Sequence, residues 1–226
     1  MIRLNIIVEG LTEETFVRDT LAPYWGAKGI FAVARSVETS RRRGRVFRGG
    51  GRNYEKIRRD VMNWINQDSD AYCTTMFDLY GLPSNFPGKS SIDFNLHTYE
   101  RVRYLENSFA ENIDNDKFIP YIQLHEFESL LFADIDKMRI FYLEGDNVIE
   151  RLKTVANTVD SPELINEGNE TAPSKRIIKE IPEYKDNKVF IGPTVAKEIG
   201  LSTLRKRCSH FNEWVSRIES IQVPGT

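Results

Sequence analysis

The sequence predicts an α/β fold, with a mostly parallel central sheet flanked by helices and a more helical C-terminal part. Short apolar stretches typical of buried strands alternate with amphipathic helical stretches as far as Leu124. Parallel strands need long crossover connections, which are usually helices. Beyond Leu124 the pattern turns largely helical. We therefore expect an α/β core over residues 1–133 and a helical extension, packed on that core, over residues 134–226.

The first elements follow from the opening residues. Ile2 to Val8 is almost continuously apolar, which predicts a buried strand. Thr12 is expected to cap the following helix, with Glu13 and Glu14 near its positive end. Residues 29–37 predict a second strand.

The rest of the core repeats this alternation. A helix is expected from Tyr54 because apolar residues recur there at helical spacing. The next strand runs through "CTTMF" and stops at Asp78, and the Gly- and Pro-rich "DLYGLPSNFPGKSS" predicts a loop. Another helix is expected around residues 102–109, and a further strand over 118–124.

Positive charge is concentrated in one segment. Residues 41–59 hold nine basic residues and one acidic residue, a net charge of +8, so the remainder carries −10 of the total of −2. We expect residues 40–53 to form an arginine-rich loop. Because flexible arginine segments bind phosphate backbones, the predicted nucleic-acid contacts are Arg41, Arg42, Arg43, Arg45, Arg48 and Arg52. The alternative is a solvated loop without a partner.

Composition excludes several classes of protein. With 40% hydrophobic and 28% charged residues the chain resembles an ordinary globular protein. No apolar stretch approaches the roughly 18 residues needed to span a bilayer, so no membrane association is expected. Cys73 and Cys208 show neither metal-binding spacing nor a disulfide framework. We expect a cytoplasmic location.

Acidic residues follow the predicted strands. Glu9 ends the first strand, Asp78 ends a later one, and "HEFESLLF" follows Leu124. Function in parallel α/β sheets collects at the carboxyl ends of the strands. If "HEFESLLF" is helical, Glu128 shares the apolar face with Leu131, and Glu126 does not. The alternative for each acid is structural: a cap or turn residue, or a buried acid bonded to a basic side chain.

These acids predict a site for a hard cation. If Glu9, Asp78 and Glu128 converge, they offer oxygen ligands without His or Cys, which suits Mg²⁺ or Mn²⁺. Such ions bridge carboxylates and substrate phosphates. An anionic polymer beside several acids would otherwise be repelled.

Several motifs resemble a known family. "VEGLTEE" resembles the first motif of TOPRIM (topoisomerase–primase) domains, and "FDLYG" stands where that family carries an Asp-x-Asp pair. With "QLHEFESLLF" and "TAPSKRI", the order of motifs resembles an uncharacterised bacterial family related to TOPRIM nucleases of the overcoming-lysogenization-defect type. The likeness extends from Ile2 to about Ile177.

The resemblance implies roles for individual residues. Glu9 would be a metal ligand or general acid/base, Glu13 a second ligand, and Asp78 the first Asp of the pair. Tyr80 replaces the second Asp, which removes one carboxylate, and Glu126 or Glu128 would substitute for it. Lys175 would neutralise phosphate charge; its alternative is an exposed lysine that begins a helix.

Together these observations predict a Mg²⁺-dependent, TOPRIM-type nuclease that hydrolyses phosphodiester bonds in DNA or RNA. Catalysis would fall to Glu9, Asp78, Glu128 and Lys175, with Glu13 and Glu126 as further metal ligands. The resemblance also implies a role in defence against phage or mobile elements beside a partner ATPase. The alternative is a non-catalytic subunit that binds nucleic acid or an ATPase.

Overall fold

Two units make up the chain. The structure is a computed structural model that describes residues 1–42, 45–48, 53–143, 146–165, 168 and 171–221, with 38–42, 45–48 and 146 described by their backbone alone. The first unit comprises Met1–Gln123 together with the C-terminal residues from Glu219, and the second comprises Leu124–Ile218. The boundary between them, expected at 133/134, lies at 123/124.

A parallel sheet organises the first unit. Its strand order is β2-β1-β5-β6, and β7 also pairs with β5. Every pairing in this sheet is parallel, as predicted. The strands are β1 (Ile2–Val8), β2 (Ile30–Ser36), β5 (Tyr72–Asp78), β6 (Phe118–Ile119) and β7 (Ile122–Gln123).

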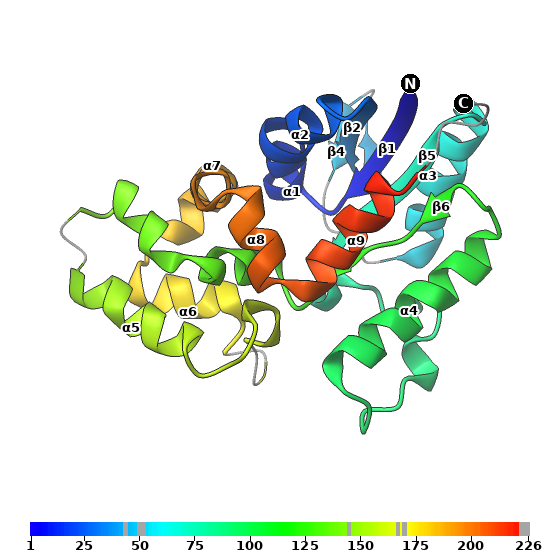
Figure 1. Ribbon diagram of the computed structural model, residues 1–226. Coiled ribbons are helices and arrows are strands. Elements are labelled where there is room, and N and C mark those ends of the chain that lie inside the picture. The colour runs from blue at the N-terminus through cyan, green and yellow to red at the C-terminus, as the bar shows by residue number, and fades with distance from the viewer. Residues whose placement is uncertain (43–44, 49–52, 144–145, 166–167, 169–170, 222–226) are drawn as a thin grey trace. The chain divides into compact units, whose positions relative to one another are not determined.

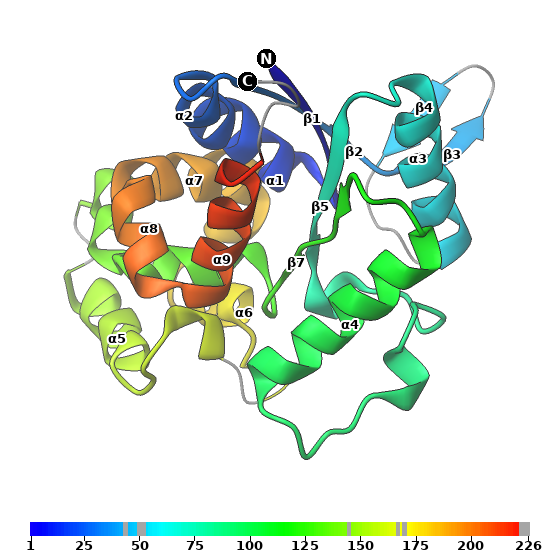
Figure 2. The same cartoon turned by 45° about the vertical axis from the view of Figure 1, so that its right-hand side comes forward.

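Helices cover both faces of this sheet. The first crossover contains α1 (Leu11–Phe16), a π-helical stretch (Val17–Leu21) and α2 (Ala22–Gly26), and it lies on one side of the strands (Figure 2). On the other side lies α3 (Tyr54–Gln67), whose buried residues are Tyr54, Ile57, Val61, Trp64 and Ile65. These are the residues whose spacing predicts the apolar face.

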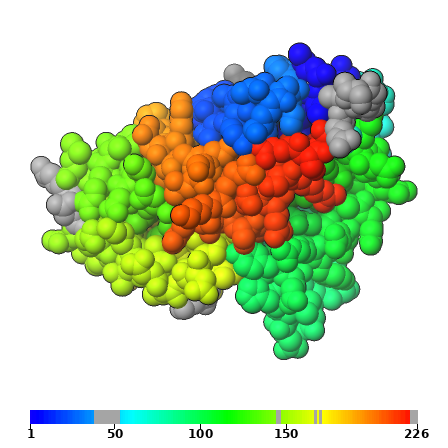
Figure 3. All heavy atoms as spheres, viewed as in Figure 1, coloured from blue at the N-terminus to red at the C-terminus, as the bar shows by residue number. Residues whose placement is uncertain are grey.

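The last crossover of the first unit is longer. After β5 come the 3₁₀ turns η2 (Leu79–Gly81) and η3 (Lys89–Ser91), and then α4 (Thr98–Ile113). The space-filling view shows this green segment projecting from the rest of the first unit (Figure 3). Its base is anchored by an aromatic cluster in which Phe109 packs edge-on against Tyr54, Phe86 and Phe118.

The arginine-rich segment is not simply a loop. Its backbone forms two antiparallel strands, β3 (Glu38–Arg42) and β4 (Arg45–Arg48), so the loop prediction for residues 40–53 is wrong over these strands. In the register, Arg42 lies opposite Arg45 and Arg41 opposite Val46. Thr39, Val46 and Phe47 are residue types that favour strands. Arg43 and Arg52 lie outside the described residues.

The second unit is helical, as predicted. Helices α5 to α8 all contact the 3₁₀ segment η4 (Figure 1). Four large apolar side chains of η4 are buried at the centre: Phe127, Leu130, Leu131 and Phe132. The elements are η4 (Phe127–Ala133), η5 (Ile135–Ile140), α5 (Asp146–Ala156), η6 (Pro162–Leu164), α6 (Pro173–Glu180), α7 (Tyr184–Ile199), α8 (Leu201–Arg207) and α9 (Ser209–Glu219), which ends in the first unit.

Glu163 binds the N-terminal turn of α9 within the second unit. Its side chain is fully buried and accepts backbone hydrogen bonds from His210 (3.0 Å) and Phe211 (2.8 Å). The first N–H groups of a helix lack partners within the helix, and a carboxylate there also benefits from the helix dipole. No helix in the described ranges is long and apolar enough to cross a membrane.

We predict that Glu163→Ala lowers the free energy of unfolding by about 3 kcal/mol, because it leaves two buried N–H groups without their acceptor. Denaturant titration measures the change. The control is Glu150→Ala, which removes an acid that is 58% exposed and paired with Arg139 at 3.0 Å. That variant is expected to lose less than about 1 kcal/mol. Equal losses in the two variants would contradict the role given to Glu163.

Candidate functional site

The carboxyl ends of β1 and β5 bring two predicted site residues together. These strands are adjacent and parallel, with Val8 in register with Met76. The Glu9 N–H donates to the Met76 carbonyl at 3.3 Å, and the Asp78 N–H donates to Glu9 Oε2 at 3.2 Å. Glu9 and Asp78 are therefore neighbours at one edge of the sheet, as the sequence predicts.

The Glu9 carboxylate has a structural task at this edge. Because β1 ends at Val8, the ladder between the two strands stops at Met76, two residues before Asp78. The Glu9 side chain accepts the next N–H of β5 in place of a backbone carbonyl. One carboxylate oxygen is thus committed to the strand end, and the hydrogen bond fixes the orientation of the group.

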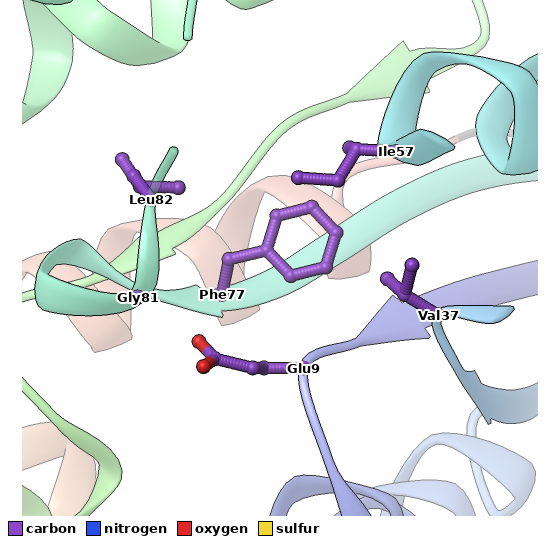
Figure 4. A pocket seen from close by; sticks show the side chains of 6 residues that line it. All are labelled: Glu9, Val37, Ile57, Phe77, Gly81 and Leu82. Atoms are coloured by element: carbon purple, nitrogen blue, oxygen red, sulfur yellow. The ribbon is translucent and has the colours of Figure 1, made fainter. Parts of the chain in front are cut away.

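A small pocket opens beside Glu9. Its cavity volume is about 10 Å³, roughly the space of one water molecule, and Glu9 is the one charged residue among the described residues that line it. Figure 4 shows the carboxylate reaching below the Phe77 ring toward Gly81. The lining residues come from three strand ends, α3 and η2: Glu9, Val37, Ile57, Phe77, Gly81 and Leu82. A carboxylate with apolar walls on one side is partly shielded from water, which strengthens its interaction with a cation.

Gly81 is needed for this arrangement. A Cβ built at Gly81 would lie 2.6 Å from Glu9 Cδ, well inside van der Waals contact. Only glycine leaves room for the carboxylate against the η2 turn. Sequence reasoning did not single out Gly81; the available signal was its place in "DLYGLP", three residues after the acid that ends β5.

Asp78 approaches the edge from the other face of the sheet. Side chains alternate along a strand, so Asp78 follows Met76 to the face opposite Phe77, which lines the pocket. An ion held by both carboxylates would therefore lie over the edge between the two strands.

Two neighbouring acids on α1 hold the crossover in place. Glu13 is 5% exposed and accepts the Gly10 N–H at 2.9 Å, and Glu14 accepts the Ser36 N–H at 3.2 Å. The helix begins at Leu11 with Gly10 as its cap, so the prediction of Thr12 as the cap is wrong. The bond from the Gly10 N–H to the Glu13 carboxylate is one half of a capping box, and the cap lies two residues earlier than expected.

The acids of "HEFESLLF" belong to the second unit. This stretch forms a 3₁₀ segment, so the angular argument for an α-helix does not apply, although Glu128 is buried as it predicted. Glu126 accepts the Ser174 N–H at 2.9 Å, and the Tyr184 hydroxyl donates to Glu128 at 3.3 Å. Burial raises the pKa of Glu128, an effect that Lys188 opposes and Glu126 reinforces.

The basic residues predicted to contact phosphate belong to different units. Lys175 is exposed in the first turn of α6, in the second unit, which matches its structural alternative. The backbone of β3 and β4 holds Arg41, Arg42, Arg45 and Arg48 in the first unit.

The donor set fits a hard divalent cation with few protein ligands. Among the residues that the structure describes, no group of three or more His, Cys, Asp or Glu side chains is placed to hold a metal ion. Glu9 and Asp78 supply carboxylate oxygens at one edge. Mg²⁺ is commonly bound through one or two carboxylates with water and substrate phosphates completing the shell, so two are sufficient.

Comparison with known proteins identifies a family. The family model described as "Domain of unknown function (DUF4276)" matches residues 8–219, nearly the whole chain. Neither the curated proteins nor the solved structures contain a match.

We predict that Gly81→Ala destabilises the protein by about 1 kcal/mol, because the added methyl group displaces the Glu9 carboxylate from the Asp78 N–H. In a Glu9→Ala background the same change is expected to cost less, and a double-mutant cycle with denaturant unfolding measures the difference. Gly26→Ala is the control, since a Cβ there meets nothing within 4 Å. Additive effects of Glu9→Ala and Gly81→Ala would contradict the close contact.

We predict that Glu128→Gln changes how stability depends on pH. The wild-type carboxyl, with its pKa raised in the folded state, contributes stability that is fully present below pH 4.5 and is lost as pH rises toward the folded-state pKa. The amide does not ionise, so the variant is expected to gain stability relative to wild type as pH increases above 4.5. Unfolding titrations from pH 4 to 8 measure this, with Glu150→Gln as control. A constant difference between variant and wild type would contradict the assignment.

Proposed function

The chain belongs to the DUF4276 family, and we propose that it is a nuclease that uses Mg²⁺ or Mn²⁺ to hydrolyse phosphodiester bonds in nucleic acid. The observation that carries the proposal is the meeting of Glu9 and Asp78 at the carboxyl edge of β1 and β5. Active sites of parallel α/β sheets are built at such edges. The resemblance of "VEGLTEE" to the first TOPRIM motif supports Glu9, and that of "FDLYG" to the Asp-x-Asp motif supports Asp78.

Glu9, Asp78 and the apolar wall of the pocket would have different parts in the proposed reaction. Glu9 is oriented by the Asp78 N–H and by its contact with Gly81, so its carboxylate would lose little side-chain freedom on binding a ligand. Asp78 offers a second carboxylate from the opposite face. When bound, the divalent cation would neutralise phosphate charge and lower the pKa of a bound water. The apolar wall of Phe77 and Leu82 limits water on one side of Glu9.

Binding of a polyanion is proposed for the basic segment. Residues 41–59 carry a net charge of +8 in a chain of net charge −2. Arginine-rich segments bind phosphates largely without regard to sequence, and this binding weakens steeply with salt. The proposed substrate is therefore DNA or RNA, recognised through its backbone. A role in defence beside a partner ATPase rests on the TOPRIM resemblance alone.

A second candidate function is a non-catalytic binding subunit. Tyr80 stands where the TOPRIM pair has its second Asp, and the described residues contain no set of three metal-binding side chains. Such a subunit would bind nucleic acid or an ATPase without cutting. Glu9 and Gly81 would then serve only the geometry of the strand end.

We predict that Glu9→Gln and Asp78→Asn each reduce Mg²⁺- or Mn²⁺-dependent cleavage of DNA or RNA by about 100-fold or more. The Glu9→Gln side chain can still accept the Asp78 N–H, so the strand end is preserved while the charge is lost. Gel assays of cleavage, with Mn²⁺ binding followed by electron paramagnetic resonance, measure both effects. The control is Glu111→Gln, an exposed acid of α4.

Three outcomes are distinguished by this assay. Loss of both cleavage and Mn²⁺ binding in the two variants, but not in Glu111→Gln, supports the nuclease. Cleavage that survives both substitutions contradicts the proposed centre. Salt-sensitive nucleic-acid binding with no cleavage by the wild type favours the binding subunit.

A further inference from the structure

The outer strand of the sheet has one backbone edge without a strand partner among the residues that the structure describes. β2 pairs with β1 over its whole length, from Ile30 opposite Ile2 to Ser36 opposite Val8. It is the first strand in the sheet order, and no strand among the described residues pairs with its other edge. A parallel ladder uses alternate residues, and the Val37 N–H donates to the Val8 carbonyl. The backbone groups of Ala32 and Ala34 therefore point outward.

Several of the features that keep an exposed strand from pairing are absent from β2. Proteins usually protect edge strands with lysine, proline, a bulge or a short length. β2 has seven residues, "IFAVARS", with neither lysine nor proline and with a regular register against β1. Its one charged group, Arg35, lies over the ring of Trp64 at 4.6 Å.

Apolar side chains beside this edge are exposed. Phe31 is 60% and Val33 43% exposed, and the two lie on the same face of β2 because they are two residues apart. Such side chains on an unprotected strand are typical of a surface that another strand covers.

We propose that a second copy of this chain adds its own β2 to this edge, antiparallel, about a two-fold axis at Val33. In that register Val33 faces Val33 of the partner subunit, and Phe31 faces Arg35 of the partner subunit. Ala32 and Ala34 exchange backbone hydrogen bonds with Ala34 and Ala32 of the partner subunit. The backbone N–H and C=O groups that form these bonds are the ones of Ala32 and Ala34 that point away from β1.

The strand is complementary to itself in this register. A two-fold interface must present the same surface twice. Arg35 meets an aromatic ring rather than a second arginine, so no like charges are opposed, and a cation over an aromatic face is attractive. Only the small side chain of alanine stands at the two hydrogen-bonding positions on the buried face. The proposed pairing ends before Ser36, because the Ser36 N–H already donates to Glu14.

Sedimentation or light scattering of the full chain over a concentration range tests this arrangement without metal or nucleic acid, so the result is independent of the proposed nuclease activity. The wild type is expected at twice the 26.2 kDa chain mass. Val33→Lys places two lysines opposite each other and is expected to give the 26.2 kDa monomer. The matched control is Val189→Lys, at a valine of the second unit that is 39% exposed, which is expected to remain dimeric.

A cross-link tests the register itself. Opposed residues at a non-hydrogen-bonded position lie close enough for a disulfide, so oxidised Val33→Cys is expected to run as a covalent dimer. Val189→Cys is expected to stay uncross-linked, and the native Cys73 and Cys208 are buried. A wild type that is monomeric at every concentration overturns the proposal, as does a dimer that survives Val33→Lys. A dimer in which Val33→Cys fails to cross-link overturns the stated register.

Discussion

The parallel pairing of β1 with β5 determines which side chains can act together in the first unit. It places Glu9 beside Asp78 although they are 69 residues apart in the chain. The register ends at Val8 and Met76, and this termination frees the Asp78 N–H to bind the Glu9 side chain. The pocket depends on the same termination, since its walls are the residues that follow the ends of β1 and β2 and the last residues of β5 with the turn after it. A shift of this register by one residue would separate the two carboxylates and remove the pocket.

Several buried and half-buried glutamates share one structural use. Glu13, Glu14 and Glu126 each accept a backbone N–H at the end of an element, and Glu163 accepts two. These bonds satisfy donors that helices and strands leave unpaired. Glu9 makes the same kind of bond, but it also borders a solvent-open pocket and has a second acid beside it. That combination separates a candidate catalytic carboxylate from a structural one.

The sequence was sufficient for the fold class and for the meeting of Glu9 with Asp78. Apolar strand patterns can be seen locally in the sequence, and the residues that follow parallel strands lie at one edge of the sheet. It was insufficient where tertiary contacts decide. Glu128 is held by a hydrogen bond from Tyr184, 56 residues further along the chain, which no local pattern encodes. Gly81 matters through a steric contact with Glu9 that no periodicity encodes. The β3–β4 hairpin was missed because runs of arginine are typical of loops.

The central claim is that Glu9 and Asp78 together hold a divalent cation at the edge of the sheet. Anomalous scattering from a crystal soaked in Mn²⁺ measures this directly. The account predicts a peak within about 2–2.5 Å of an oxygen of each carboxylate. A peak that contacts neither residue, or a crystal saturated with Mn²⁺ that shows no peak at this edge, would contradict it.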